Sequence, residues 1–423
     1  MSSFFRRGLA AACLIALTST ARAQNTPTTF PSVDSLPEIH DLPDPFVMND
    51  GQRVTTPQQW QARRAEMRKM IEYYLTGTMP PPPGNVTGDV LDDRLLADDS
   101  IRFRRVKLIF GPGKKLSFEI GLFLPTTGAG PFPTVINISF NPTPGAPLPP
   151  TTTPATSTTQ IAIFEKMKNA RIPENAAKGV IADAVKRGYV VIQYNYQQCG
   201  ADNRKDCKST GFFSAYPEYD WGDIGAWAWS MSRVVDYVQS VPEIDSKKLI
   251  ALGHSRLGKT TLVAGAFDDR FAMVAPAGSG CAGTGAFRFN GPGRGDKQGI
   301  EDFATRFDYQ LGPRMPQFID HVYKLPFDQH WLIAMCAPRP FMAAEGLDDG
   351  ACNGKATKHA ILGAQPVFDF LQVSDNLGIH FRPGKHMLAP EDWKAVLDFA
   401  DIHLRGMKVE GDFKTFPADE LLH

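Results

Sequence analysis

The sequence predicts an α/β protein of three layers, in which a mostly parallel central sheet is covered by helices on both faces. Short apolar runs at 133–140, 189–194 and 249–252 are typical of strands that are buried on both sides. Segments with the apolar spacing of helices, at 176–187 and 223–239, separate these runs. Strands that alternate with helices pair in parallel, because each crossover helix returns the chain to the same end of the sheet.

The first 23 residues are expected to be a secretory signal peptide. Arg6 and Arg7 precede an apolar run at 9–17, and the sequence Ala-Arg-Ala at 21–23 has the small-residue pattern of a cleavage site. The run is too short to span a membrane, which takes about 20 apolar residues. We therefore expect a secreted or periplasmic protein without a membrane anchor.

Residues 24–100 are expected to form an N-terminal extension packed on an α/β domain at 101–423 that carries the chemistry. Within the extension, Thr56 followed by Pro57 is the pattern of an N-cap and a first helical residue. The helical pattern continues to about Leu75. We expect a helix between these points.

The domain at 101–423 begins with alternating apolar and polar residues at 101–124, which predict a hairpin of two antiparallel strands. A long loop rich in Pro and Thr at 141–159 follows the first buried strand, and loops of this length often cover a site. Further strands are expected at 270–276, 337–345 and 379–382, and a last helix at 390–404.

The composition excludes binding that depends on a large net charge. The 423 residues are 43% hydrophobic and 21% charged, an ordinary balance for a globular chain. Lys and Arg together number 45, as do Asp and Glu, so nothing favours nucleic acid or an anionic membrane surface. We expect a monomer that binds neither.

Cysteine spacing suggests disulfides but no metal site. Once the predicted signal peptide is removed with Cys13, Cys199 and Cys207 flank a polar loop and are the expected disulfide pair. Cys281 with Cys352 is a second candidate pair, for which unpaired buried thiols are an equal alternative. Neither a C-x-x-C pair nor an H-E-x-x-H motif occurs, so we expect no metal site.

The strongest chemical signal is a strand, a sharp turn and a helix around Ser255. Gly253 and Ser255 follow the strand at 249–252, and a helical segment comes next. Such a turn raises the serine hydroxyl above the strand and points the first free N–H groups of the helix at the same place. Gly253 leaves room for the turn, whereas the second glycine, Gly258, comes three residues after the serine and not two. Ser255 is the predicted nucleophile.

His386 is the expected general base. In a sheet of this type the catalytic groups gather at the carboxyl ends of strands, in the chain order nucleophile, acid, histidine. His386 lies between the last strand and the last helix, whereas His380 and His403 lie inside those elements. His254 is adjacent to the serine and is expected to point away from it. His386 would take the proton of Ser255 and return it to a leaving alcohol.

The acid that orients the histidine is expected after the strand that ends near residue 345. A carboxylate there could accept the other ring N–H of the histidine and stabilise the imidazolium. Asp349 is the preferred candidate, and Asp348 and Glu345 are the alternatives. A carboxylate that is not the acid is expected to cap the loop at 350–354.

The run GHSRLGK at 253–259 resembles the G-x-S-R-x-G-K serine motif of the glucuronoyl esterases, carbohydrate esterase family fifteen. Similar blocks are DWGDIGAWAW at 220–229, SGCAG at 279–283, PFDQH at 326–330 and APRP at 337–340. The resemblance covers most of the chain beyond about residue 100. It implies an α/β hydrolase that cleaves the ester between xylan-borne 4-O-methyl-glucuronic acid and lignin alcohols, through a covalent acyl-enzyme and without a cofactor.

The same resemblance implies that Arg256 helps to hold the oxyanion and that Lys259 binds the uronate sugar. Both residue types suit these roles. A fixed cation directly after the nucleophile stabilises developing negative charge. Lys259, one helical turn from the serine, could reach a substrate hydroxyl or carboxylate.

The chain departs from the family pattern at two places. Many members carry a glutamate after the strand that follows the elbow, where this chain reads APAG at 275–278. Some members instead resemble this chain in placing an acid where Asp349 stands, and a tryptophan of the sugar site corresponds to Ala351 here. These departures favour a promiscuous esterase. The alternatives are a general carboxylesterase or acetylxylan esterase, and a catalytically inactive hydrolase fold that binds carbohydrate or a partner.

Overall fold

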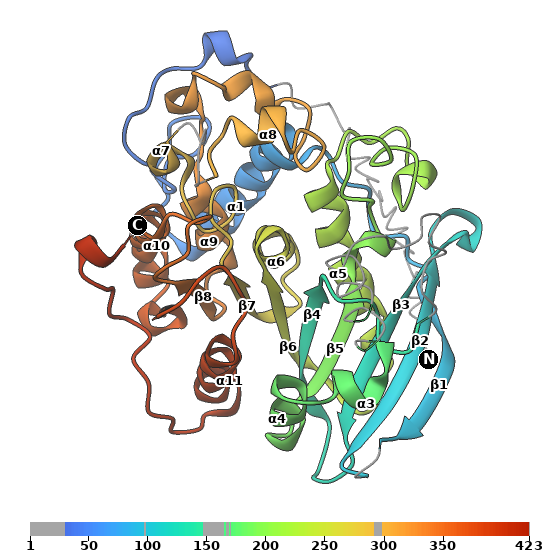
Figure 1. Cartoon of the computed structure of the whole chain (residues 1–423). Helices are drawn as coiled ribbons and strands as arrows, with labels where there is room; N and C mark the ends of the chain where they lie inside the picture. The colour runs from blue at the N-terminus through green and yellow to red at the C-terminus, as the bar shows by residue number, and fades with distance from the viewer. Residues whose placement is uncertain are drawn as a thin grey trace, which may run out of the picture. The chain divides into compact units, whose positions relative to one another are not determined.

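A nine-stranded sheet organises the chain in the computed structural model (Figure 1). The model describes residues 30–96, 99–146, 165, 169, 171–291 and 298–422. The predicted signal peptide at 1–23 and most of the loop predicted at 141–159 lie outside this part. The strands are β1 (Thr87–Leu95), β2 (Ile101–Phe110), β3 (Leu116–Pro125), β4 (Phe132–Ser139), β5 (Val190–Asn195), β6 (Ile244–His254), β7 (Phe271–Ala277), β8 (Phe341–Gly346) and β9 (Leu377–Arg382).

The sheet is mostly parallel, as the sequence predicted. Its strand order is β1-β2-β3-β5-β4-β6-β7-β8-β9. The pairs that involve β1, β2 and β3 are antiparallel, including the predicted hairpin of β2 and β3. The remaining pairs, from β5 to β9, are parallel. The carboxyl ends of six strands therefore meet at one edge of the sheet.

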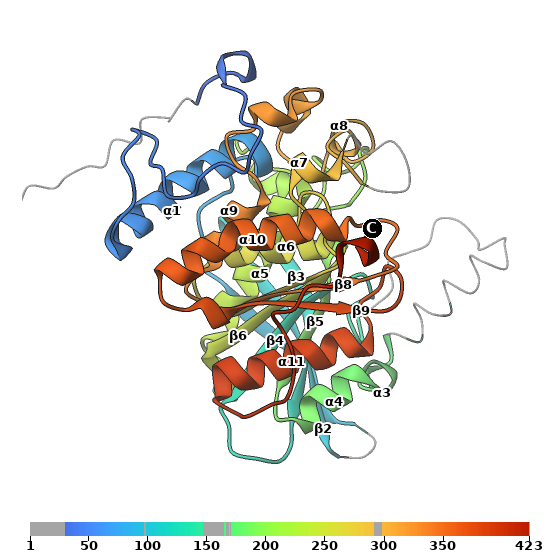
Figure 2. The same cartoon turned by 90° about the vertical axis from the view of Figure 1, so that its left-hand side faces the viewer.

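Helices cover both faces of the sheet. In Figure 2, α5, α6 and α10 lie on one side of it, and α4 and α11 lie on the other. The helices are α1 (Pro57–Ile71), α3 (Pro173–Ala176), α4 (Val180–Lys186), α5 (Asp223–Val238), α6 (Arg256–Phe267), α7 (Phe287–Asn290), α8 (Asp302–Thr305), α9 (Gln329–Cys336), α10 (Gly354–Phe370) and α11 (Pro390–Arg405). One core packs Ile181 of α4 and Val396 of α11 against Ile250 of β6. The predicted α/β sandwich is confirmed.

Helix α1 begins at the predicted N-cap. The Thr56 hydroxyl accepts the N–H of Gln59, and the Gln59 side chain accepts the N–H of Thr56, which completes a capping box. The helix passes into a π-turn at Glu72–Thr76 and ends at Gly77, whose φ of 74° suits a residue without a Cβ. Arg68 of α1 donates to the Phe267 carbonyl at 2.9 Å and so ties the helix to the end of α6.

Several elements of the structure have no counterpart in the sequence analysis, among them strand β1 and helix α10. Strand β1 lies inside the segment expected to be an extension, yet it pairs with β2 along its length. Its residues are mostly exposed on both faces, so they carry no alternation to detect. Helix α10 is 17 residues long but contains Pro366, and this proline obscures the helical pattern. Strand β8 also begins at Phe341, four residues later than predicted.

The expected disulfide between Cys199 and Cys207 is wrong, and for Cys281 and Cys352 the alternative of unpaired buried thiols is confirmed. Cys199 and Cys207 are free thiols, and so are Cys281 and Cys352. The Cys207 sulfur instead donates to the Arg204 carbonyl at 3.5 Å, within its own loop. All four side chains are buried, and burial raises the pKa of each thiol.

No helix within the described residues is long and apolar enough to cross a membrane.

Candidate active site

The turn that carries Ser255 is a strained elbow between β6 and α6. Ser255 has φ 60° and ψ −127°, a conformation that costs a non-glycine residue energy and that active sites often retain. Its N–H donates to the Ala277 carbonyl of β7 at 2.9 Å, and its carbonyl accepts the Gly258 N–H at 2.8 Å. These bonds hold the backbone on both sides of the serine, so the hydroxyl projects from a fixed point.

The two glycines of the elbow are required by close contacts. A Cβ on Gly253 would lie 2.4 Å from the Leu257 carbonyl oxygen. A Cβ on Gly258 would lie 2.8 Å from the Ala277 carbonyl oxygen, because the first turn of α6 packs directly on β7. The second glycine therefore lies three residues after Ser255, and not two, because Gly258 is where α6 contacts β7.

Ser255, His386 and Asp349 form one chain of hydrogen bonds. His386 Nε2 lies 2.8 Å from the Ser255 hydroxyl oxygen, and His386 Nδ1 lies 2.7 Å from Asp349 Oδ2. The His386 side chain is 31% exposed and that of Asp349 is 2% exposed, so the imidazole faces solvent while its acid partner is shielded. The structure thus brings together the three predicted residues in the geometry of a nucleophile, a base and an orienting acid.

The surroundings of Asp349 keep it ionised. Burial raises the pKa of this carboxyl, but the hydrogen bond and charge of His386 and the N–H of Ala351 outweigh it, so the pKa lies below its usual value. A carboxylate here stabilises an imidazolium at His386. The two other candidates for the acid bind groups other than His386. Asp348 accepts a hydrogen bond from the Gly384 N–H at 2.8 Å, and Glu345 accepts one from the Thr284 hydroxyl at 2.8 Å.

Glu345 is a buried carboxyl that forms no ion pair with a described residue. It is 3% exposed, and burial raises its pKa to about 8. The folded state therefore holds a proton that the unfolded state releases above its ordinary pKa of 4.5. The stability that this proton provides is complete below pH 4.5 and is lost as the pH rises through about 8.

Replacing Glu345 with Gln is expected to remove this dependence, because an amide can accept from Thr284 at every pH. Between pH 5 and 8 the Glu345→Gln variant should gain stability relative to the wild type by up to about 1.4 kcal/mol per pH unit. Urea unfolding at several pH values measures the difference. Glu420→Gln, at an exposed carboxyl, is the control. Parallel pH profiles for wild type and Glu345→Gln would contradict a protonated Glu345.

Arg256 is held by a carboxylate that the sequence analysis missed. Its Nη1 donates to Asp202 Oδ2 at 2.5 Å, and the same carboxylate accepts the Tyr196 hydroxyl at 2.6 Å and the Gln310 amide at 3.0 Å. The Asp202 side chain is 7% exposed. Its position shortly after the carboxyl end of β5 is the one signal that could have identified it. Asp202 fixes the guanidinium of the predicted oxyanion residue beside Ser255.

Lys259 is more deeply buried than a residue that binds a sugar at the protein surface. Its side chain is buried, and Nζ donates to the Ser279 carbonyl at 2.5 Å. Burial lowers the pKa of the ammonium group. The Phe303 ring centre lies 5.7 Å from Nζ. Of its three N–H donors, one is bound to Ser279, so the group retains capacity for a further acceptor.

His254 packs against the predicted base, a contact that the sequence analysis did not predict. Its ring centre lies 4.5 Å from that of His386, at an interplanar angle of 46°. Burial, with the nearby His386, lowers the pKa of His254 to about 3. The neutral ring packs against the His386 ring. Gly278, directly after β7, leaves space for it, because a Cβ at this position would lie 2.9 Å from His254 Nε2.

Asp349, His386 and Cys352 also place three possible metal-ligating atoms within 4.8 Å of one another. Two of these groups are already hydrogen-bonded to each other. The Cys352 thiol donates to the Gly278 carbonyl at 3.2 Å. The pairing of acid and base accounts for this cluster without a metal ion.

A doubly wound sheet with a serine on the elbow after β6, paired to a histidine before α11, defines the class of α/β hydrolases. The family model of fungal glucuronyl esterases matches residues 150–372. The carbohydrate esterase MZ0003, from an unknown prokaryotic organism, is 32% identical over 399 residues, which cover 87% of this chain and 90% of that protein.

Two further relatives agree. The 4-O-methyl-glucuronoyl methylesterase of Podospora anserina is 29% identical over 82% of this chain and 65% of its own length. The structure of a carbohydrate esterase family 15 glucuronoyl esterase from Caldicellulosiruptor kristjansonii has a TM-score of 0.71 at 29% identity, and the match covers 92% of this chain and 98% of that one. The chain belongs to the glucuronoyl esterases, carbohydrate esterase family 15, and is a carboxylic ester hydrolase.

Proposed function

We propose that the chain hydrolyses esters of 4-O-methyl-glucuronic acid, with Ser255 as the nucleophile, His386 as the general base and Asp349 as the acid that orients it. The observation that carries the proposal is the continuous hydrogen-bonded chain from the Ser255 hydroxyl through His386 to Asp349. Family membership supports the glucuronate ester as substrate, since one relative is named a 4-O-methyl-glucuronoyl methylesterase.

The reaction proceeds in two halves. His386 takes the Ser255 proton as the hydroxyl attacks the ester carbonyl, and the imidazolium then protonates the departing alcohol oxygen. The acyl group remains on Ser255 until a water molecule, deprotonated by His386, releases the glucuronate. The N–H of Arg256, at the start of α6, lacks a carbonyl partner within the helix and faces the oxyanion with the guanidinium.

The natural substrate class follows from the resemblance of the serine motif to the family. We propose that the chain hydrolyses the esters that join glucuronate branches of xylan to lignin alcohols. We also propose that it acts as a monomer outside the cytoplasm. The predicted signal peptide at 1–23 supports this location. Arg256 and Lys259, in the first turn of α6, supply hydrogen-bond donors that suit the oxygens of a sugar ester.

Hydrolysis of benzyl glucuronate by wild type and Ser255→Ala tests the proposal. Loss of the nucleophile is expected to lower kcat by about a million-fold, to the background of the remaining site. The wild type should also be labelled at Ser255 by a fluorophosphonate.

Three outcomes separate the alternatives. Brisk cleavage of acetates without turnover of the glucuronate ester would identify a general carboxylesterase or acetylxylan esterase. Inactivity on both, with no labelling, would identify a binding protein. Activity that survives in Ser255→Ala would reject Ser255 as the nucleophile.

A further inference from the structure

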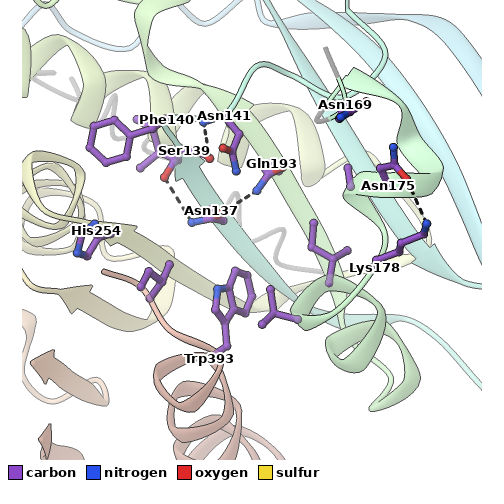
Figure 3. Close-up of a pocket in the computed structure, with 15 residues that line it drawn as sticks. Asn137, Ser139, Phe140, Asn141, Asn169, Asn175, Lys178, Gln193, His254 and Trp393 are labelled. Carbon is purple, nitrogen blue, oxygen red and sulfur yellow. Dashed lines mark hydrogen bonds between the residues drawn. The ribbon is translucent and has the colours of Figure 1, made fainter. Parts of the chain in front are cut away.

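The two residues that flank Ser255 have different surroundings. His254 lines a cavity of about 490 Å³ at the carboxyl end of β4, and Figure 3 shows its ring at one edge of that cavity. Arg256 is not among the described residues that line the cavity. It belongs instead to a hydrogen-bonded network that connects the first turn of α6 with the first turn of α5. The position of the predicted oxyanion guanidinium therefore depends on this network.

Asp202 is the centre of the network. Its carboxylate accepts hydrogen bonds from three parts of the chain, through Arg256 of α6, Tyr196 after β5, and Gln310. Its backbone has a φ of 56°, in the left-handed region that residues other than glycine rarely adopt. Such a conformation persists when surrounding contacts hold it. The direction of the Asp202 carboxylate thus depends on what binds its backbone.

The contact that holds this backbone comes from Asp223, the first residue of α5. Asp223 Oδ2 accepts the Asp202 N–H at 3.0 Å, and Asp223 is 0% exposed. The carboxyl packs on Gly200, where a Cβ would lie 3.0 Å from Asp223 Oδ1. The Trp227 indole, one turn further along α5, donates to the Gly200 carbonyl at 3.2 Å. Two side chains of α5 therefore hold the turn at 200–202.

The start of α5 also holds the segment that carries Gln310. The Asp223 N–H donates to the Tyr309 carbonyl at 3.0 Å, and the Ile224 N–H donates to the Gln310 carbonyl at 3.0 Å. These are N–H groups that a helix leaves without partners in its first turn. The Gln310 side chain then reaches Asp202 Oδ1 at 3.0 Å. Asp202 is thus held from its backbone and from its carboxylate by segments that are bound to the same helix end.

We propose that Asp223 is a positioning residue for the reaction, because it fixes the backbone of Asp202, whose carboxylate in turn fixes the Arg256 guanidinium for the oxyanion. The inference rests on the proposed function, in which Arg256 meets the oxyanion. A cation that is held in place before the reaction stabilises the transition state without the cost of reordering it. Asp223 is fully buried, so it acts through Asp202 and not on the substrate. Its loss should lower kcat more than it changes KM.

An amide should replace the Asp223 carboxyl in this role. Burial raises the pKa of Asp223 to about 7, so the carboxyl is partly protonated at neutral pH. Asn offers the Asp202 N–H an oxygen acceptor at the same place, whereas Ala offers none. Asp223→Asn is therefore expected to keep kcat within about threefold of the wild type, and Asp223→Ala is not.

A double-mutant cycle with benzyl glucuronate tests the proposal. Its members are the wild type, Asp223→Ala, Arg256→Met and the double variant. Asp223→Ala alone is expected to lower kcat by about tenfold, with KM within about twofold of the wild type. In the Arg256→Met background the same change should lower kcat by less than about twofold, because the guanidinium that Asp223 positions is gone.

Asp220→Ala is the matched control. Asp220 lies three residues before Asp223 and likewise accepts a backbone N–H, that of Thr78 at 2.7 Å, but its arginine partner is Arg314, at 2.7 Å. Its variant should keep the wild-type kcat. A loss as large as that in Asp223→Ala would assign the effect to general loosening of this region and overturn the positioning role. Equal losses from Asp223→Ala with and without Arg256 would overturn it too.

Circular dichroism shows whether each variant folds. If Asp223→Ala does not fold, Asp202→Ala takes its place in the cycle, since it removes the next link to Arg256. Additive losses in that cycle, or a failure of Asp223→Asn to keep kcat in a folded protein, would overturn the positioning role and leave the proposed function intact. A wild type that does not hydrolyse benzyl glucuronate would overturn the proposed function, and the positioning role with it.

Discussion

Replacement of Asp349 with Asn is expected to lower kcat for benzyl glucuronate by about ten-thousand-fold. The amide keeps the shape of the carboxylate but offers His386 Nδ1 an N–H in place of an acceptor, or a neutral oxygen in place of a charge. His386 then lacks the tautomer that accepts the Ser255 proton, and its imidazolium loses the counter-charge 2.7 Å away. Steady-state kinetics on a folded variant, checked by circular dichroism, measure the effect.

Asp348→Asn is the matched control, because the neighbouring carboxylate binds the Gly384 N–H and not the histidine. It should retain nearly full kcat. A loss in Asp348→Asn as large as that in Asp349→Asn would mean that the loop, and not one carboxylate, sets the activity. A large loss in Glu345→Gln alone would transfer the role of the acid to Glu345.

Replacement of Arg256 with Met is expected to lower kcat by about 100- to 1000-fold, with a smaller effect on KM. A donor that meets charge only in the transition state contributes to the chemical step and little to substrate binding. The side chain of Arg256 is 29% exposed and is fixed by Asp202, so its cation is preorganised for the oxyanion. Separate kcat and KM values from initial rates decide between the two effects.

Arg306→Met is the control for the loss of a positive charge near the same ring. Both guanidiniums lie over Phe307, at 5.5 Å for Arg256 and 5.1 Å for Arg306. Arg306 is 65% exposed and pairs with Asp302. Its variant should keep the wild-type kcat. Equal losses in the two variants would show that general charge near the site, and not a fixed donor, is what matters.

The elements that position the site were predictable from local patterns. The runs that form β4, β5 and β6 are apolar because both faces of the sheet are covered, and buried strands of this kind are readily detected. The chain order of Ser255, Asp349 and His386 follows from the fold, and the structure brings the three together. Local pattern and topology point to the same residues here.

The missed features depend on contacts between distant segments. Asp202 lies 54 residues before Arg256, and nothing in its local sequence indicates that a buried carboxylate will bind that guanidinium. The contact of His254 with His386 was not predicted, because the space for its ring comes from Gly278, which follows β7. Strand β1 escaped detection since backbone pairing with β2, and not burial of side chains, places it in the sheet.

The free thiols have a consequence for how the protein matures. Cys199, Cys281 and Cys336 are buried, and a thiol reacts as its thiolate, which burial disfavours. The finished fold therefore keeps these groups reduced even in an oxidising compartment. Before folding the same groups are accessible, and any pair can be oxidised. For a chain secreted as proposed above, folding before oxidation, and not a set of native cross-links, would prevent mispaired disulfides.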